Sequence, residues 1–141
     1  MSNVLIPLTD ADCLTLLASN DIGRVCVMQE GYPMAFPVNY RLVEFDGDPV
    51  LAIRTRPGNS VDHVGEHVSL EIDGVDPGRD SGWSVIVRGR LEQVSPGADV
   101  DSYPMITSQR DAWRVIVPAK ITGRGVRADP MRWSFHPAGY L

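Results

Sequence analysis

The residues that follow one apolar segment have the composition of an anion-binding site. Two arginines, two hydroxyl side chains and an asparagine lie within the seven residues Arg54-Thr55-Arg56-Pro57-Gly58-Asn59-Ser60. Guanidinium groups, hydroxyls and backbone N–H groups at the end of a strand are donors that bind phosphate. A solvated loop that holds two arginines by chance has the same composition and is the commoner case. The residues of this loop alone leave both interpretations open.

Two apolar segments must position this loop. They span residues 33–40 and 49–54, and Asp46-Gly47-Asp48 between them supplies turn residues. Gly47 can adopt φ > 0 without steric cost, as a tight hairpin turn requires. We therefore expect a hairpin whose second strand, residues 49–55, carries the loop at its end.

The remaining pattern predicts a mainly β chain with few helices. Thr9 is the expected N-cap of a helix over residues 10–19, with Asp10 and Asp12 in its first turn. Alternation and turn residues predict further strands at 22–29, 32–40 with a continuation to 45, 67–73, 83–94, 115–127 and 131–135. A short helical piece is expected at 60–65, and residues 101–113 are expected to be helical or irregular around Pro104. Six or seven short strands indicate a small antiparallel barrel or sandwich, formed by a single domain over residues 1–141.

Composition argues against several classes of protein. The 141 residues carry a formal net charge of −5, which gives no general attraction to nucleic acid. No apolar run approaches the roughly 18 residues of a membrane span. The two cysteines, Cys13 and Cys26, are expected to be reduced and buried in a cytoplasmic protein. Any anion site must therefore be local.

Other candidate chemistry has less support. The chain has no GxSxG, Walker A, GxGxxG or CxxC motif. His63 and His67 have a zinc-ligand spacing, but Gly65 lies between them and a strand begins at His67, so no metal site is predicted. Three carboxylates close in sequence are interpreted as the charged ends of a loop, with a glycosidase-type acid pair as the alternative: Glu71, Asp73 and Asp76.

The order of the short motifs resembles a known family. After the N-terminal helix come Gly23-Arg24-Val25, Pro37-Val38-Asn39-Tyr40, Ile53-Arg54-Thr55, Glu71-Ile72-Asp73, Gly82-Trp83-Ser84-Val85 and Ile121-Thr122-Gly123-Arg124. This order resembles the FMN-binding split-barrel proteins of the pyridoxamine 5'-phosphate oxidase-like superfamily, in particular a small single-domain branch found in actinobacteria. The resemblance implies a six-stranded antiparallel split β-barrel with two to three short helices. It also implies a homodimer with FMN in the groove between the subunits.

The resemblance implies which residues contact the flavin ring. Val38 and Asn39 match the strand whose backbone runs along the isoalloxazine. Trp83 and Ser84 match the strand start that flanks the flavin, and Arg124 matches a C-terminal arginine near the dimer site. Backbone groups suit the polar edge of such a ring, and aromatic or aliphatic side chains suit its faces.

At the phosphate end the chain departs from the family pattern. Arg54 and Thr55 match the positions that hold the FMN phosphate, but relatives then read Gly-[Ser/Thr]-Lys, where this chain reads Gly58-Asn59-Ser60. Arg56 can replace the lost lysine, or Asn59 and Ser60 can donate neutral hydrogen bonds. Losing one charge-assisted contact costs about 1.5–3 kcal/mol. The departure implies weaker FMN binding, a preference for the deazaflavin F420, or no cofactor.

Three functions follow from the residues and the resemblance. The first is an FMN-dependent oxidoreductase that acts on a small-molecule substrate, with Tyr40, His63 and His67 as candidate substrate-side groups. The second is a protein that binds or sequesters a flavin, F420 or haem without turnover. The third is a structural homodimer whose cofactor groove is vestigial. Neither nucleic acid nor a membrane is an expected partner.

Overall fold

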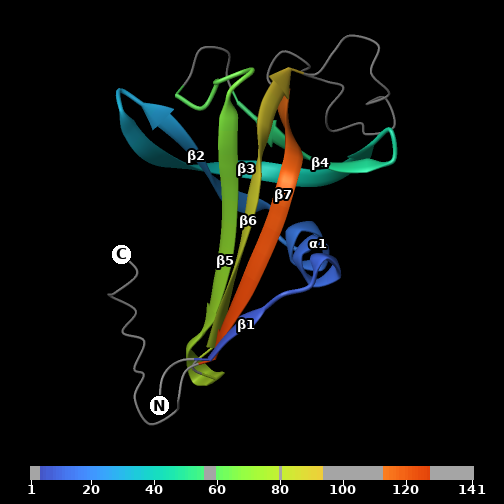
Figure 1. Cartoon of the computed structure of the whole chain (residues 1–141), viewed down its shortest axis with the longest axis vertical. Coiled ribbons are helices and arrows are strands. Elements are labelled where there is room, and N and C mark those ends of the chain that lie inside the picture. The colour runs from blue at the N-terminus through green and yellow to red at the C-terminus, as the bar shows by residue number, and fades with distance from the viewer. Residues whose placement is uncertain (1–3, 56–59, 80, 94–112, 128–141) are drawn as a thin grey trace.

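The structure, a computed structural model, describes residues 4–55, 60–79, 81–93 and 113–127. Over these residues it contains seven strands, one α-helix and one short 3-10 helix (Figure 1). The strands are β1 (Val4–Pro7), β2 (Ile22–Gln29), β3 (Tyr32–Phe45), β4 (Asp48–Arg54), β5 (His67–Asp76), β6 (Ser81–Gln93) and β7 (Trp113–Arg127). The helix α1 spans Asp10–Ala18, and the 3-10 helix η1 spans Pro77–Arg79. The expected mainly β chain is confirmed.

All strands pair antiparallel in one sheet that closes on itself. Six strands form the ring in the order β7, β4, β3, β2, β5 and β6, and β6 pairs again with β7. Figure 1 shows β5, β6 and β7 as long strands side by side, with β2, β3 and β4 crossing near one end. The seventh strand was not predicted: Val4–Pro7 lies along Arg124–Arg127 of β7. It covers an edge of β7 that the ring leaves open.

Alternation along the strands separates a core face from an outer face. Val25 and Val27 of β2 are buried, whereas Arg24 and Met28 are exposed. In the other strands of the ring the residues on the inner face build one main core, which includes Leu51, Ile53, Leu70, Ile72, Val85, Val87, Leu91 and Ile116. On β4 both faces are buried, because Val50 and Ala52 pack with Val43 and Trp113 in a second, smaller cluster. The outer face therefore holds the side chains that are available to ligands or partners.

The strand β3 joins the two halves of the ring. Residues 32–39 pair with β2, and residues 40–45 pair with β4, without a register shift between them. Pro33 and Pro37 lie in the first half, which has a strand on one side only. This position suits residues that have no N–H group to donate, because proline within a sheet is tolerated at an edge.

The predicted caps and turns are present. Thr9 caps α1 by accepting a hydrogen bond from the backbone N–H of Asp12 at 3.1 Å. Both hairpin turns use two residues with positive φ, Glu30-Gly31 and Asp46-Gly47. This is the conformation that matches the right-handed twist of the flanking strands.

The prediction of a helix at residues 60–65 is wrong. The backbone N–H of Gly65 bonds to the carbonyl of Leu91 on β6, and Gly65 itself has a positive φ of 86°. Pairing with β6 thus replaces helical hydrogen bonds. Residues 101–113, expected to be helical or irregular, lie outside the described residues except Trp113, which begins β7. The expected strand at 131–135 also lies outside them. No helix in the described ranges is long and apolar enough to cross a membrane.

A substitution at Gly89 tests the closure between β6 and β7. The register shifts between Arg88 and Gly89, and a Cβ on Gly89 would lie 2.3 Å from the carbonyl oxygen of Val117. Gly89→Ala should lower the free energy of unfolding by about 1–3 kcal/mol, measured by urea unfolding. Gly78→Ala is the control, since its nearest heavy atom is 3.5 Å away. Equal unfolding midpoints for the two variants would contradict this geometry.

Candidate functional site

Arg54 lines a cavity at the end of β4. It is the last residue of β4, its side chain is exposed, and it pairs with Trp113 of β7. The cavity has a volume of about 390 Å³ and is lined by Asp21, Asn39, Tyr40, Arg41, Arg54 and Trp113. Two predicted cofactor residues, Arg54 and Asn39, are therefore brought together. Two guanidinium groups in one cavity suit a dianion such as phosphate.

Sequence reasoning missed Arg41. It stands two residues after Asn39 on β3, so both side chains point to the same side of the sheet. Arg41 pairs with Ala52, which is two residues before Arg54 on β4. The alternation of inward and outward side chains along β3 could have revealed Arg41, because it places Asn39 and Arg41 on the same face, on either side of Tyr40. Arg41 supplies a second cation beside Arg54 in this cavity.

The residues that flank the loop are firmly anchored. Thr55 and Val61 are buried, with 3% and 5% of their surface exposed. Ser60 is exposed, and its carbonyl accepts a hydrogen bond of 2.7 Å from Nε2 of Gln29. Asn59, the other predicted residue of this loop, lies outside the described residues. The side chain of Thr55 is buried, whereas the side chain of Arg54 faces solvent.

A buried ion pair fixes the far side of the loop. Nε of Arg114 donates to Oδ1 of Asp62 at 2.9 Å, and Nη2 donates to Oδ2 at 3.4 Å. The side chain of Arg114 is 5% exposed and that of Asp62 is 12% exposed. Arg114 also donates to the carbonyl of Trp113 at 3.0 Å. This pair ties the loop to the start of β7, beside the wall of the Arg54 cavity.

The other predicted residues form a second cluster at the start of β6. Ser84 lies between Asp73 of β5 and Arg124 of β7 in the register, so these three residues share the outer face. Val85 of β6 belongs to the core. Trp83 stands two residues before Val85, so its side chain lies on the same face of β6 and packs against the core. A Cβ at Gly74 would lie 2.6 Å from Nε1 of Trp83, so the indole rests on this glycine.

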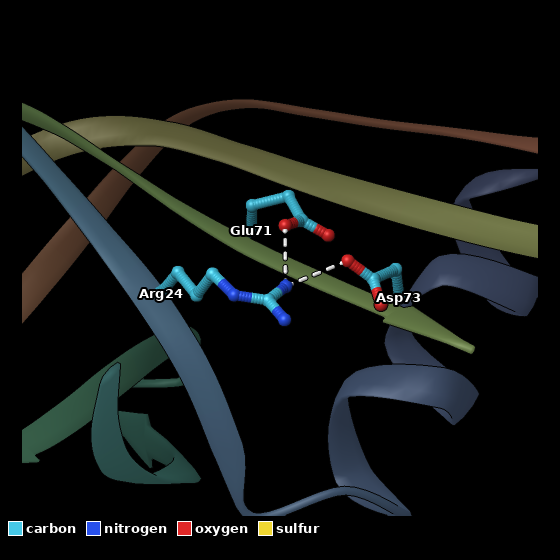
Figure 2. A network of polar contacts seen from close by, with 3 residues as sticks. All are labelled: Arg24, Glu71 and Asp73. Carbon is cyan, nitrogen blue, oxygen red and sulfur yellow. Dashed lines mark hydrogen bonds and ion pairs between the residues drawn. The ribbon is translucent and has the colours of Figure 1, made fainter. Parts of the chain in front are cut away.

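A network of three charged residues lies between the two clusters (Figure 2). Nη1 of Arg24 on β2 bonds to Oε2 of Glu71 at 3.2 Å and to Oδ2 of Asp73 at 2.7 Å, both on β5. The expectation that these carboxylates end a loop is wrong, because β5 continues to Asp76. Two carboxylates two residues apart on a strand share a face. One cation can therefore bind both.

The network holds a carboxyl group that titrates near neutral pH. Burial, together with the carboxylate of Asp73, raises the pKa of Glu71 to about 7. The hydrogen bond with Glu71 and the charge of Arg24 lower the pKa of Asp73 below 3.8. Oε1 of Glu71 is buried and has no hydrogen-bond partner among the residues that the structure describes. Glu71 can therefore hold or release a proton on the outer face at neutral pH.

The clusters and the network form one continuous polar surface. We call it the outer band, and it comprises Arg54, Asn39, Arg24, Glu71, Asp73, Ser84 and Arg124, on six neighbouring strands of the ring. Asn39 pairs with Ile22 of β2, which stands two residues before Arg24 and is 62% exposed. Asn39 and Ser84 are three strand spacings apart, about 14 Å. The band thus places cations at both ends, an apolar side chain within it and a titratable carboxyl near its middle.

Val38 and three proposed substrate-side residues have other surroundings. Val38 is 9% exposed and belongs to the core, so only its backbone is available to a ligand. Tyr40 is 1% exposed, and its hydroxyl donates to the carbonyl of Leu17 at 2.7 Å, so it secures α1. Burial raises the pKa of Tyr40 to about 12. His63 bonds to Glu66, whereas His67 is exposed at the start of β5.

The described residues contain no metal-binding cluster of three or more His, Cys, Asp or Glu side chains. Cys13 and Cys26 are both free thiols. Cys13 is buried as expected, whereas Cys26 is half-buried on the outer face. Burial raises the pKa of both thiols, which disfavours the nucleophilic thiolate.

The fold and the site define a small β domain with a polar surface on the outside of a closed sheet. A model of the pyridoxamine 5'-phosphate oxidase family matches residues 9–124, and the chain belongs to this family. The uncharacterized protein Rv0080 of Mycobacterium tuberculosis is 33% identical over 135 residues, which cover 89% of this chain and 88% of that protein. The predicted family is thereby confirmed.

Solved structures of flavin-binding proteins share the fold. A FAD-binding protein from Mycobacterium smegmatis is 27% identical with a TM-score of 0.69, over 88% of this chain and 100% of that chain. A FAD-binding protein from Mesorhizobium loti has a TM-score of 0.71 over 90% of this chain and 100% of that chain. Its identity of 21% supports the fold alone.

The raised pKa of Glu71 predicts a pH dependence of stability. In the unfolded chain Glu71 titrates near 4.5, so between pH 4.5 and about 7 the folded state binds more protons. The free energy of unfolding should therefore fall as pH rises through this window. In Glu71→Gln this component should disappear, as measured by urea unfolding at pH 4.5 and 8.

The exposed Glu44→Gln on β3 is the matched control and should keep the wild-type profile. Asp73 does not confuse the result, because its lowered pKa removes stability only below pH 3.8. Parallel profiles for the wild type and Glu71→Gln would contradict the assignment.

Proposed function

We propose that this protein is an FMN-dependent oxidoreductase of the pyridoxamine-phosphate-oxidase-like type. In this proposal the ring is the six-stranded split barrel of the family, the chain is a single domain over residues 1–141, and two chains form a homodimer. The observation that carries the proposal is the meeting of Arg54, Arg41 and Asn39 in one cavity at the end of the outer band. The name of the 27% identical FAD-binding protein also supports a flavin, with F420 as the alternative cofactor.

The donors of this cavity fit a phosphate. A phosphate dianion is best held by guanidinium groups together with neutral donors, and Arg54, Arg41 and Asn39 supply both kinds. The ion pair of Asp62 with Arg114 holds the loop beside them, and Ser60 and Asn59 would add neutral donors. The second guanidinium offsets the missing family lysine.

The rest of the outer band would receive the flavin ring. The backbone of Val38 and Asn39 would face its polar edge, and Ile22 would cover apolar ring atoms. Ser84 and Arg124 would meet the same cofactor from the other end of the band, whereas Trp83, whose side chain packs against the core, would offer only its backbone. Asn39 and Ser84 are about 14 Å apart on the outside of a closed ring. A convex surface cannot enclose a ligand, so a second copy of the chain would complete the groove.

Bound flavin would supply the electron-transfer chemistry that no side chain of this protein provides. The protein's own residues would bind, orient and shield the small-molecule substrate beside it. Glu71 is poised to hold a proton near neutral pH, and Arg24 fixes the position of its carboxyl group. A carboxyl with a pKa near the working pH is suited to exchange protons with a reacting group.

The purified protein tests the proposal directly. The visible absorbance spectrum and the mass of the co-purifying small molecule identify the cofactor, and light scattering gives the mass of the assembly. We expect a dimer with bound flavin that is reduced by NAD(P)H and reoxidised by an acceptor. A colourless monomer that FMN and F420 do not stabilise against heat would overturn the proposal. Bound flavin without turnover would instead support a flavin-sequestering protein.

Arg54 is predicted to dominate binding of the phosphate group. Arg54→Ala should weaken FMN binding by about ten- to a hundred-fold, because it removes a charge-assisted contact. Isothermal titration calorimetry measures the change. The control Arg90→Ala removes a β6 arginine that bonds to Glu92 outside the cavity, and it should bind FMN like the wild type. Equal affinities for both variants would mean that the phosphate is held elsewhere.

Ser60 gives the complementary prediction. Ser60→Lys restores the family cation at an exposed position and should tighten FMN binding by about ten-fold. Riboflavin, which lacks the phosphate, should bind both proteins equally. No gain for FMN would indicate that Arg41 or Arg56 already fills the role of the lysine.

A further inference from the structure

A second cavity lies on the outer face, away from the predicted cofactor residues. It has a volume of about 410 Å³ and is lined by Cys26, Val27, Met28, Pro33, His67, Val68, Ser69, Arg88, Gly89 and Ala119. None of the nine predicted flavin residues lines it. Arg88 is four residues from Ser84 along β6, which corresponds to about 13 Å. The size lies in the range of small-molecule sites, roughly 300–1,000 Å³.

One cation, Arg88, lines this cavity, and a second cation, Lys120, stands beside it on β7 and lines a neighbouring cavity. Arg88 of β6 pairs in register with Lys120 of β7, so their side chains project from neighbouring positions on the outer face. Like charges placed directly opposite each other repel. Among the described residues, neither side chain bonds to a carboxylate, although Asp10 and Asp48 line the same cavity as Lys120. An anion placed between them would remove this repulsion.

The strands around the cavity are shaped to leave it open. The register shift at Arg88 and Gly89 leaves Ala119 without a paired residue, and Ala119 lines the cavity with its small side chain. β-Bulges often re-aim side chains beside ligand sites. Met28, Pro33 and Ala119 give the cavity apolar walls, whereas Ser69 adds a hydroxyl next to Arg88. The apolar walls suit the apolar part of a small ligand, and the cations suit a negatively charged group at its end.

We propose that this cavity binds a small organic acid, a molecule with a carboxylate on an apolar body. The carboxylate meets Arg88 and Lys120 and accepts a hydrogen bond from Ser69. The apolar body lies against Met28, Pro33 and Ala119. This site is independent of the proposed flavin site, because the two share no lining residue.

Benzoate is the probe, and binding is followed by ¹H–¹⁵N NMR titration of the full chain. We expect saturable shifts that centre on Ser69, Arg88 and Ala119. Arg88→Gln and Lys120→Gln should each weaken binding by about ten-fold through loss of one charge-assisted contact. Benzamide, the neutral isostere, should bind the wild type more weakly by a similar factor. Arg90→Gln is the matched control and should bind benzoate like the wild type.

Several outcomes would overturn the proposal. Equal affinities of the wild type for benzamide and benzoate would exclude recognition of the carboxylate charge. Benzoate shifts that vanish in Arg54→Ala but persist in Arg88→Gln would place the ligand in the flavin cavity. Absence of saturable benzoate binding would also overturn the proposal. If Arg88→Gln or Lys120→Gln then also changed the molecular mass measured by light scattering, this face would be an interface between copies of the chain. Failure of flavin binding alone would leave the benzoate result intact.

Discussion

The pairing of β6 with β7 is the interaction on which the rest of the structure depends. Every residue of β6 from Ser81 to Gln93 has a partner on β7, and this ladder closes the ring of six strands. Without it, two long edges would expose unpaired N–H and C=O groups. Because the ring is closed, side chains that alternate along each strand point either into the ring or out of it. The apolar side chains fill one core, and the polar side chains are left on the surface where ligands can reach them.

The outer band is a consequence of this closure. Arg24, Glu71 and Ser84 are far apart in sequence, yet register places them on adjacent strands. Two carboxylates on β5 would repel each other on an exposed strand, and the guanidinium of Arg24 offsets this repulsion. The balance is incomplete, because burial and Asp73 still raise the pKa of Glu71 to about 7. The same arrangement that stabilises the face therefore creates a group that can exchange protons.

Local patterns predicted much of the fold and less of the site. The bounds of β2, the cap at Thr9 and the turn at Asp46-Gly47 follow from neighbouring residues, and the sequence predicted them. The pairing of Arg24 with Glu71 depends on strand register, which links residues 47 positions apart. The same holds for Asp62 and Arg114, which are 52 positions apart. Strand β1 is too short to show alternation, and only the open edge of β7 explains it.

The net negative charge of the chain does not prevent local anion binding, because the electric field of each exposed charge is screened over a short distance. The formal net charge is −5, but the described carboxylates Glu71, Asp73 and Glu92 are each bonded to an arginine. Screening limits the field of an exposed charge to about 8 Å at physiological ionic strength. Arg88 is separated from Ser84, and Lys120 from Arg124, by about 13 Å along their strands. An anion at the Arg88 cavity would therefore scarcely affect one at the Ser84–Arg124 end of the outer band, whereas Glu71 and Arg24 stand only two residues, about 7 Å, from Ser69 and Cys26 of that cavity.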